Sequence, residues 1–267
     1  MPQPPVPAPV PDPVPDPAAI AAVTRRLGAS PHRLSAAQVS RFWQDGVLGP
    51  LACGAPQLQG LLDQLLNASA SEAITAAMPG RDRDGKRNLH DPQQHLLSVR
   101  ELARHASIVH PVAQLLGSAE LSFFQARFRV KAPQQADPQP WHQDVGRNHG
   151  GLFRDGSPIP SLTVWLSLDG ADAASGGVVA LPGSHRQLLG NWPAGFHGLR
   201  ELQASLDTRQ ARVLATPAHH FQIFHSWTVH CSLSNDSPRR RSALILRYMP
   251  RRHAVDVSFH HDPCGLS

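Results

Sequence analysis

Hydrophobic positions in the N-terminal part of the chain recur at the spacing of one helix face. Three stretches show this pattern and predict helices: 18–29, 35–46 and 55–69. In the second stretch, Ser35 is an N-cap candidate and Gly46 the expected end. The polar residues 78–94 predict a loop. Residues 96–117 predict two short helices broken near Pro111, because proline disrupts a helix interior.

After residue 119 the pattern changes to short runs rich in β-branched and aromatic residues, separated by turn residues. Six such runs predict strands: 121–130, 161–168, 176–183, 219–224, 228–234 and 242–250. Helical patterns are sparse in this part of the chain, which argues against a parallel α/β sheet. The spacing of the runs fits a β-sandwich or a double-sheet jelly roll, against which we expect the N-terminal helices to pack.

Proline stands at nearly every second position of residues 1–17, which we expect to form a disordered tail. Residues 18–267 are expected to form a single domain. No run approaches the roughly 18 apolar residues of a membrane helix. No charged segment leads into an apolar stretch as in a secretory signal, so a cytoplasmic protein without a membrane partner is expected. The three cysteines form no CxxC pair, which disfavours a structural zinc site or a disulfide framework.

The net charge of +5 could indicate a nucleic-acid partner, but the arginines are spread along the chain. No basic run alternates with aromatic residues, so we expect no nucleic-acid binding. A site that attracts an anionic small molecule explains the charge balance equally well.

The triplet His142-Gln143-Asp144 is the first candidate for chemistry. On a strand, residues two apart point to the same face, so an imidazole and a carboxylate can converge on one ion. A second histidine from a distant strand would complete the facial triad that is diagnostic of non-haem iron(II) oxygenases. The triplet alone is weak evidence, because His260 and Asp262 form another one near the C-terminus.

The segment from Val229 to Tyr248 strengthens this interpretation, because it reads as a hairpin. A turn centred on Asp236 and Ser237 would place Arg241 opposite Ser232. Since residues two apart on a strand share a face, His230 and Arg241 would then face the same interior. A buried arginine beside a metal site needs an anionic partner, and a dicarboxylate cosubstrate would supply one.

Four segments together resemble the phytanoyl-CoA dioxygenase family of iron(II)/2-oxoglutarate-dependent oxygenases. They are LSAAQVSRFWQDGVL, WHQD, VWLSLDGADAASGGVVALPGSH and HCSLSNDSPRRRSALILRY. The resemblance covers roughly residues 34 to 250. It implies an α+β, mainly β fold with a double-stranded β-helix (jelly roll) core and flanking N-terminal helices.

The resemblance also implies roles for individual residues. Iron(II) ligands would be His142, Asp144 and His230. The cosubstrate 2-oxoglutarate would be held by Arg241 at its distal carboxylate, with Ser232 beside that carboxylate and Trp165 lining the pocket. Gly176 and Gly177 would permit a tight strand connection. The presence of a carboxylate at Asp144 disfavours halogenation, since related halogenases carry a small residue there.

Candidate substrate contacts come from several parts of the chain. They are Arg87, Asn88, Gln125, Arg127, Arg147 and His185. The first two lie in a polar stretch that fits a solvated loop equally well, and His185 is either a structural or a substrate-facing residue. Arg247 has the same parity as Arg241, and it is either a member of a structural ion pair or a ligand contact.

The expected activity is hydroxylation of an unactivated C–H bond of a small molecule, using iron(II), 2-oxoglutarate and O₂ and releasing succinate and CO₂. Carboxylate-bearing compounds and secondary metabolites are candidate substrates, whether free, CoA-bound or carrier-tethered. Desaturation, epimerisation, cyclisation and a non-catalytic jelly-roll binding protein remain alternatives. The chain has no HExxH motif of a zinc protease and no closely spaced HxH followed by Glu as in a cupin. The sequence does not decide between a monomer and a homodimer.

Overall fold

The computed structural model describes residues 14–54, 56–71, 74, 87–144, 153–154, 157–188, 206–256 and 262–266. The predictions for residues 1–13 and for Arg147 fall outside these ranges. The helices of the described residues are α1 (Pro17–Leu27), α2 (Ala36–Asp45), α3 (Pro56–Ala70), α5 (Leu97–Ala103) and α6 (Ala106–Leu116). The first three coincide with the helices predicted from hydrophobic spacing.

Helix α2 begins and ends at the predicted signals. The Ser35 side chain accepts a hydrogen bond from the Gln38 amide, and the Gln38 side chain accepts one from the Ser35 amide, which forms a capping box. Gly46 adopts the left-handed conformation that terminates the helix. The chain then turns directly into strand β1 (Val47–Ala52).

Two local predictions were wrong. Pro111 lies inside α6, and the break between α5 and α6 falls instead at Arg104 and His105. The ring of His105 caps α6 by accepting from the Ser107 amide, which fixes the helix start independently of the proline. The stretch 78–94 was expected to be a loop, but its described part contains strand β2 (Arg87–His90) and a 3-10 turn at Pro92–Gln94.

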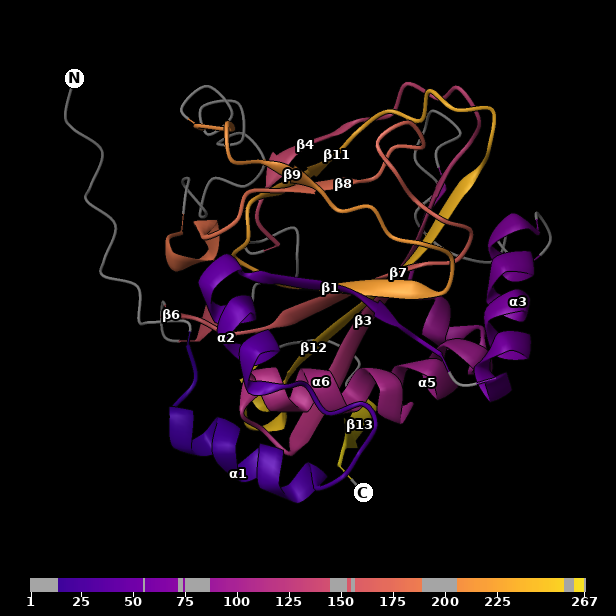
Figure 1. Ribbon diagram of the computed structural model, residues 1–267. Helices are drawn as coiled ribbons and strands as arrows, with labels where there is room; N and C mark the ends of the chain where they lie inside the picture. Colours follow the sequence, from indigo (N-terminus) through magenta and orange to yellow (C-terminus); the bar gives the residue numbers. More distant parts are fainter. Residues whose placement is uncertain are drawn as a thin grey trace.

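Two antiparallel sheets form a sandwich, with the helices packed on the outer side of the larger one (Figure 1). The larger sheet has the order β1–β10–β7–β12–β3–β13, with β2 also paired to β3. Its further strands are β10 (His220–His225), β7 (Leu162–Ser167), β12 (Arg241–Pro250), β3 (Glu120–Lys131) and β13 (Asp262–Gly265). The smaller sheet has the order β4 (Gln139–His142), β11 (His230–Ser232), β8 (Val178–Ala180) and β9 (Arg212–Val213). A short ribbon joins β5 (Phe153–Arg154) to β6 (Ser157–Pro158). The expected jelly-roll fold is confirmed.

The predicted hairpin between the segments around His230 and Arg241 does not form. Strand β11 pairs with β4 and β8 in the smaller sheet, whereas β12 pairs with β3 and β7 in the larger one. The residues between them therefore cross from one sheet to the other. Ser232 and Arg241 still face a common interior, but they do so across the sandwich and not across a turn.

Alternation along the central strands separates two environments. On β12 the side chains of Leu244, Leu246 and Tyr248 are fully buried in the main hydrophobic core, which also contains residues of α5 and α6. The odd-numbered residues of the same strand point into the sandwich, and two of them, Arg241 and Arg247, are buried arginines. The strand period of two thus places apolar residues toward the helices and charged residues toward the interior.

Among the described residues, no helix has the length and apolarity needed to cross a membrane.

Candidate functional site

Three potential metal ligands meet at one end of the sandwich interior. His142 ends β4, and His230 begins β11 directly opposite it in the antiparallel register. Asp144 follows two residues after His142. One ligand atom from each of the three side chains lies within 4.8 Å of the others, and all three side chains are buried. The carboxylate of Asp144 is 3.7 Å from Nε2 of His142 and 4.0 Å from Nε2 of His230.

Both imidazoles are oriented by the backbone. Nδ1 of His142 lies 2.9 Å from the Pro140 carbonyl, and Nδ1 of His230 lies 2.9 Å from the Thr228 carbonyl. Because a carbonyl can only accept, each Nδ1 carries the proton and each Nε2 presents its lone pair. Burial, and then the neighbouring His230, lowers the pKa of His142 to about 3, so this ring is neutral at neutral pH.

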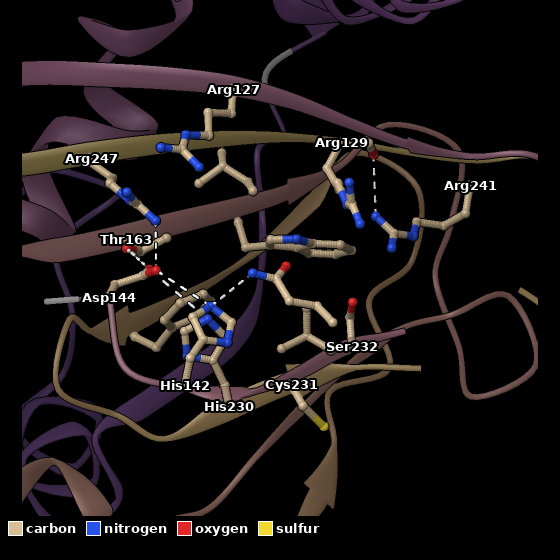
Figure 2. A pocket seen from close by; sticks show the side chains of 15 residues that line it. Arg127, Arg129, His142, Asp144, Thr163, His230, Cys231, Ser232, Arg241 and Arg247 are labelled. Carbon is tan, nitrogen blue, oxygen red and sulfur yellow. Dashed lines mark hydrogen bonds and ion pairs between the residues drawn. The ribbon is translucent and has the colours of Figure 1, made fainter. Parts of the chain in front are cut away.

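The Asp144 carboxylate is held by two side chains of the larger sheet. Arg247 donates from Nη2 to Oδ1 over 2.6 Å, and Thr163 donates from its hydroxyl to Oδ2 over 2.9 Å (Figure 2). Arg247 and Thr163 are cross-strand partners on β12 and β7. The predicted ion-pair role of Arg247 is therefore seen in the structure, and its partner is a candidate metal ligand.

Gln139 lies against the same cluster. Its side-chain amide is 3.1 Å from Nε2 of His142, where it donates to the lone pair that a metal ion would take. Metal binding through His142 therefore requires this amide to turn away. The imidazole nitrogens and the buried carboxylate fit a divalent transition metal, and two histidines with one carboxylate are the donors typical of non-haem iron(II).

Arg241 marks the other end of the cavity. Its side chain is 1% exposed, and it donates to the carbonyls of Gly176 (2.9 Å) and Arg129 (3.3 Å). Its guanidinium carbon lies 5.4 Å from the centre of the Trp165 ring, within cation–π distance. Burial lowers the pKa of Arg241 to about 10, so the group stays charged at neutral pH. Among the described residues no carboxylate lies within ion-pair distance of it, and its Nε has no hydrogen-bond partner. This buried cation fits an anionic ligand.

A second buried basic side chain lies beside Arg241. Lys131 is its cross-strand partner on β3 and is fully buried. The Lys131 ammonium donates to the hydroxyl of Ser232 over 3.0 Å and to the carbonyl of Leu233. Burial, followed by the nearby charges of Arg241 and Arg129, lowers the pKa of Lys131 to about 7. Lys131 thereby ties the hydroxyl expected near the cosubstrate to the larger sheet.

The glycine pair before β8 has the close contacts expected for a tight connection. Gly176 has a φ of +81°, and a Cβ atom there would lie 2.8 Å from the Leu233 carbonyl and 2.9 Å from the Lys131 side chain. A Cβ atom at Gly177 would lie 2.6 Å from the Asp172 carbonyl. Any side chain at Gly176 would therefore displace the carbonyl that Arg241 uses.

One cavity joins the two ends. Its empty volume is about 560 Å³ when the open space at its mouth is included. Of the residues singled out from the sequence, those that line it are His142, Asp144, His230, Arg241, Ser232, Trp165, Arg127 and Arg247. The triad and Arg247 lie at one end, and Arg129, Arg241 and Ser232 at the other (Figure 2).

The other candidate substrate contacts are not among the described side chains that line this cavity. His185 is fully buried, does not line the cavity, and its Nε2 lies 3.2 Å from the Trp43 carbonyl behind α2. Packing against Trp43 turns the ring away from this cavity, which favours the structural alternative for His185, and the substrate-facing alternative stays a prediction. Gln125 is buried and accepts a hydrogen bond from Arg247 over 2.6 Å. The backbones of Arg87 and Asn88 pair with β3, but their side chains are outside the described part of the chain.

Sequence reasoning missed four residues whose side chains make polar contacts in the cavity or its wall, which are Arg129, Lys131, Gln139 and Thr163. Arg129 continues the alternation of Gln125 and Arg127, and Lys131 lies one residue beyond the end of the predicted strand, so alternation alone could have found both. No local signal marks Thr163 or Gln139. Thr163 acts on Asp144, which the fold brings to it from a distant part of the chain, whereas Gln139 acts on His142 within the same strand β4.

The jelly roll brings two histidines, a carboxylate and a buried arginine together in one interior. This combination defines the class of non-haem iron oxygenases in which an acidic cosubstrate also binds the metal. Residues 9–243 match the family model described as phytanoyl-CoA dioxygenase (PhyH). The chain belongs to this family, as the sequence motifs predicted.

One curated relative is similar in sequence. It is the probable alpha-ketoglutarate-dependent hypophosphite dioxygenase of Stutzerimonas stutzeri, which is 26% identical over 169 residues. The match covers 61% of this chain and only 56% of that relative.

Two solved structures illustrate the shared fold. EctD from S. alaskensis, determined with 2-oxoglutarate and 5-hydroxyectoine, has a TM-score of 0.66 and 22% identity, over 82% of this chain and 77% of that one. The alpha-ketoglutarate-dependent carbocyclase SnoK from nogalamycin biosynthesis has a TM-score of 0.67 and 20% identity, over 81% of this chain and 84% of that one. At these identities the likeness establishes the fold.

Proposed function

We propose that the protein is an iron(II)- and 2-oxoglutarate-dependent dioxygenase that hydroxylates an unactivated C–H bond of a small molecule. The observation that carries the proposal is the joint presence, in one buried cavity, of the His142–Asp144–His230 cluster and the uncompensated cation of Arg241. Family membership and the alpha-ketoglutarate-dependent relative support the same reading.

His142, Asp144 and His230 would hold the iron, and Arg241 the distal carboxylate of 2-oxoglutarate. The loaded site supplies oxidising chemistry in which the substrate C–H, O₂ and 2-oxoglutarate become the alcohol, succinate and CO₂. The protein contributes orientation and charge. The carbonyls of Pro140 and Thr228 fix both imidazoles, and Arg247 with Thr163 fixes the carboxylate.

Two aromatic side chains, Trp165 and Phe224, form an apolar part of the cavity wall. The Trp165 ring lies by Arg241, and the Phe224 ring centre lies 4.7 Å from that of His230. A dry wall strengthens the charge interactions within the cavity and protects a strong oxidant from side reactions.

Anaerobic titration tests the proposal. Iron(II) with 2-oxoglutarate should give a weak visible charge-transfer band in the wild-type protein, and admission of O₂ should give succinate. The Asp144→Ala variant should lose iron affinity and succinate formation. If the wild-type protein gives neither the charge-transfer band nor succinate, the proposed enzymatic activity is wrong. Mass analysis of the product then separates hydroxylation from desaturation, epimerisation and cyclisation, for which the same loaded site is competent.

A further inference from the structure

Four polar side chains of β3 point at every second position toward the sandwich interior. Three of them have a hydrogen-bond or ion-pair partner there: Gln125 with Arg247 (2.6 Å), Arg129 with Asp137 (2.7 Å) and Lys131 with Ser232 (3.0 Å). The fourth is Arg127, which lines the cavity at the end that holds the candidate metal ligands (Figure 2). No hydrogen bond or ion pair among the described residues accounts for this buried charge.

No carboxylate is among the direct cross-strand neighbours of Arg127. It pairs with Ile245 on β12 and with His90 on β2, and Ile245 pairs in turn with Trp165. Within the described residues Arg127 forms no hydrogen bond or ion pair through its side chain, and its buried Nε has no partner.

The nearby carboxylates are engaged elsewhere. Asp144 uses one oxygen for Arg247 and the other for Thr163. Asp91 accepts from the side chain of Gln93 over 3.1 Å. Both carboxylates are near enough to raise the pKa of Arg127, but burial and the charge of Arg247 outweigh them and lower it to about 10. Arg127 is therefore a cation at neutral pH with no anion of its own.

Bound iron and cosubstrate would leave this charge unmatched. The distal carboxylate of 2-oxoglutarate is assigned to Arg241 at the opposite end. The other carboxylate of 2-oxoglutarate and Asp144 would carry two negative charges, which the ferrous ion would balance, so Arg247 and Arg127 would still add positive charge to the metal end of the cavity. Arg247 hydrogen-bonds to Asp144, whereas the Arg127 guanidinium would have no anionic partner. A partly buried cation in this situation favours an anionic ligand, which a guanidinium can bind in a bidentate fork.

We propose that Arg127 binds an oxyanion of the substrate, a carboxylate or a phosphorus oxyanion, and so holds it at the metal end of the cavity. This inference rests on the proposed function and narrows its substrate to an anionic small molecule. The reacting carbon then lies a short distance from the anionic group, because Arg127 and the triad line the same end of one cavity.

Binding of two minimal oxyanions tests this role. Protein loaded anaerobically with iron(II) and saturating 2-oxoglutarate is titrated calorimetrically with butanoate and, separately, with methylphosphonate. The wild type should bind at least one of them saturably, and the preferred one distinguishes a carboxylate from a phosphorus substrate. Arg127→Met should weaken that binding by on the order of tenfold or more, and Arg127→Lys by less. Arg212→Met, a change of an exposed arginine that pairs with Asp45 on the surface, is the matched control and should bind as the wild type does.

Three results would overturn the inference. Neither anion binds the loaded wild type, or Arg127→Met binds both as tightly as the wild type does. Alternatively, Arg127→Met weakens 2-oxoglutarate itself by a comparable factor, which would assign Arg127 to the cosubstrate. Failure of the proposed function is seen earlier and separately, as a wild-type protein that does not take up iron(II) and 2-oxoglutarate before any anion is added.

Discussion

Arg247 and Asp144 form a buried ion pair of 2.6 Å between the central strand of the larger sheet and the candidate metal cluster. Both side chains are almost fully shielded from water. The pair compensates the carboxylate charge while leaving it beside the two imidazoles. Folding of the metal-free protein and assembly of the metal ligands are therefore coupled through one guanidinium.

Replacement of this guanidinium should destabilise the metal-free protein. Arg247→Met removes the ion-pair partner of the buried Asp144 carboxylate and leaves the neutral Thr163 donor in place, and removal of one partner of a buried pair costs about 3 kcal/mol. Iron(II) should restore part of the loss by supplying a new positive charge. Urea unfolding with and without the metal measures both effects. Arg239→Met, which removes an exposed pair with Asp172, is the control and should change stability little. Equal stability of Arg247→Met and wild type without metal would contradict the coupling.

Loss of Arg241 should separate cosubstrate binding from metal binding. In Arg241→Met the 2-oxoglutarate concentration for half-maximal formation of the visible band should rise by on the order of 100-fold, because truncating one partner of a buried charge pair costs roughly 2–5 kcal/mol. Iron(II) affinity should stay near that of the wild type, since Arg241 lies at the far end of the cavity. Arg241→Lys should recover only part, because lysine lacks the planar fork. An unchanged 2-oxoglutarate requirement would move the role to Arg129 or Lys131.

Gln143 should act as a positioning residue for the metal ligands on either side of it. Its buried amide donates to the carbonyls of Trp227 and Gln187, which ties the His142–Asp144 segment to the segment before His230. Gln143→Leu should lower the free energy of unfolding by about 2 kcal/mol, because these carbonyls lose a donor. It should also weaken iron(II) binding without changing the metal ligands. Gln59→Leu, on the exposed face of α3, is the control. Wild-type iron affinity in Gln143→Leu would reject a positioning role.

Acid should destabilise the metal-free protein through His225. Burial, and then His185, lowers the pKa of His225 from 6.5 to about 3. An unfolded chain takes up the proton below pH 6.5 while the folded one does not, so this contribution is complete above pH 6.5 and is lost as the pH falls toward 3. One such group contributes a slope of up to about 1.4 kcal/mol per pH unit. His225→Asn keeps an acceptor for the Trp227 amide and should reduce the slope between pH 6.5 and 5 in urea unfolding. The exposed His95→Asn should keep the wild-type slope, and an unaltered slope in His225→Asn would count against this assignment.

Local chemistry made much of the fold predictable from the sequence. Ser35 and Gly46 set the two ends of α2 through hydrogen bonds to backbone groups that are close in sequence. The strand period predicted that His142 and Asp144 converge, and the structure brings them together although β4 ends at His142 and Asp144 lies beyond it. The predicted break at Pro111 was wrong because the effect of a proline depends on where the helix begins, and the cap at His105 sets that position.

The candidate site was predictable only where parity sufficed. Ser232 and Arg241 were expected in one interior for a reason that proved wrong, since a turn signal looks the same in a hairpin and in a link between two sheets. Thr163 could not be found, because its contact with Asp144 depends on the pairing of β7 with β12. The order in which distant strands pair in a sheet cannot be predicted from any short stretch of sequence.

The alternation of β12 has a consequence for how such a protein can diversify. Leu244, Leu246 and Tyr248 bind the strand to the helical layer, while Arg241 and Arg247 serve the interior. The ten residues of this strand thus serve two purposes at alternate positions. Selection can change the odd-numbered residues, and with them the ligand preference, while the even-numbered residues keep the scaffold intact.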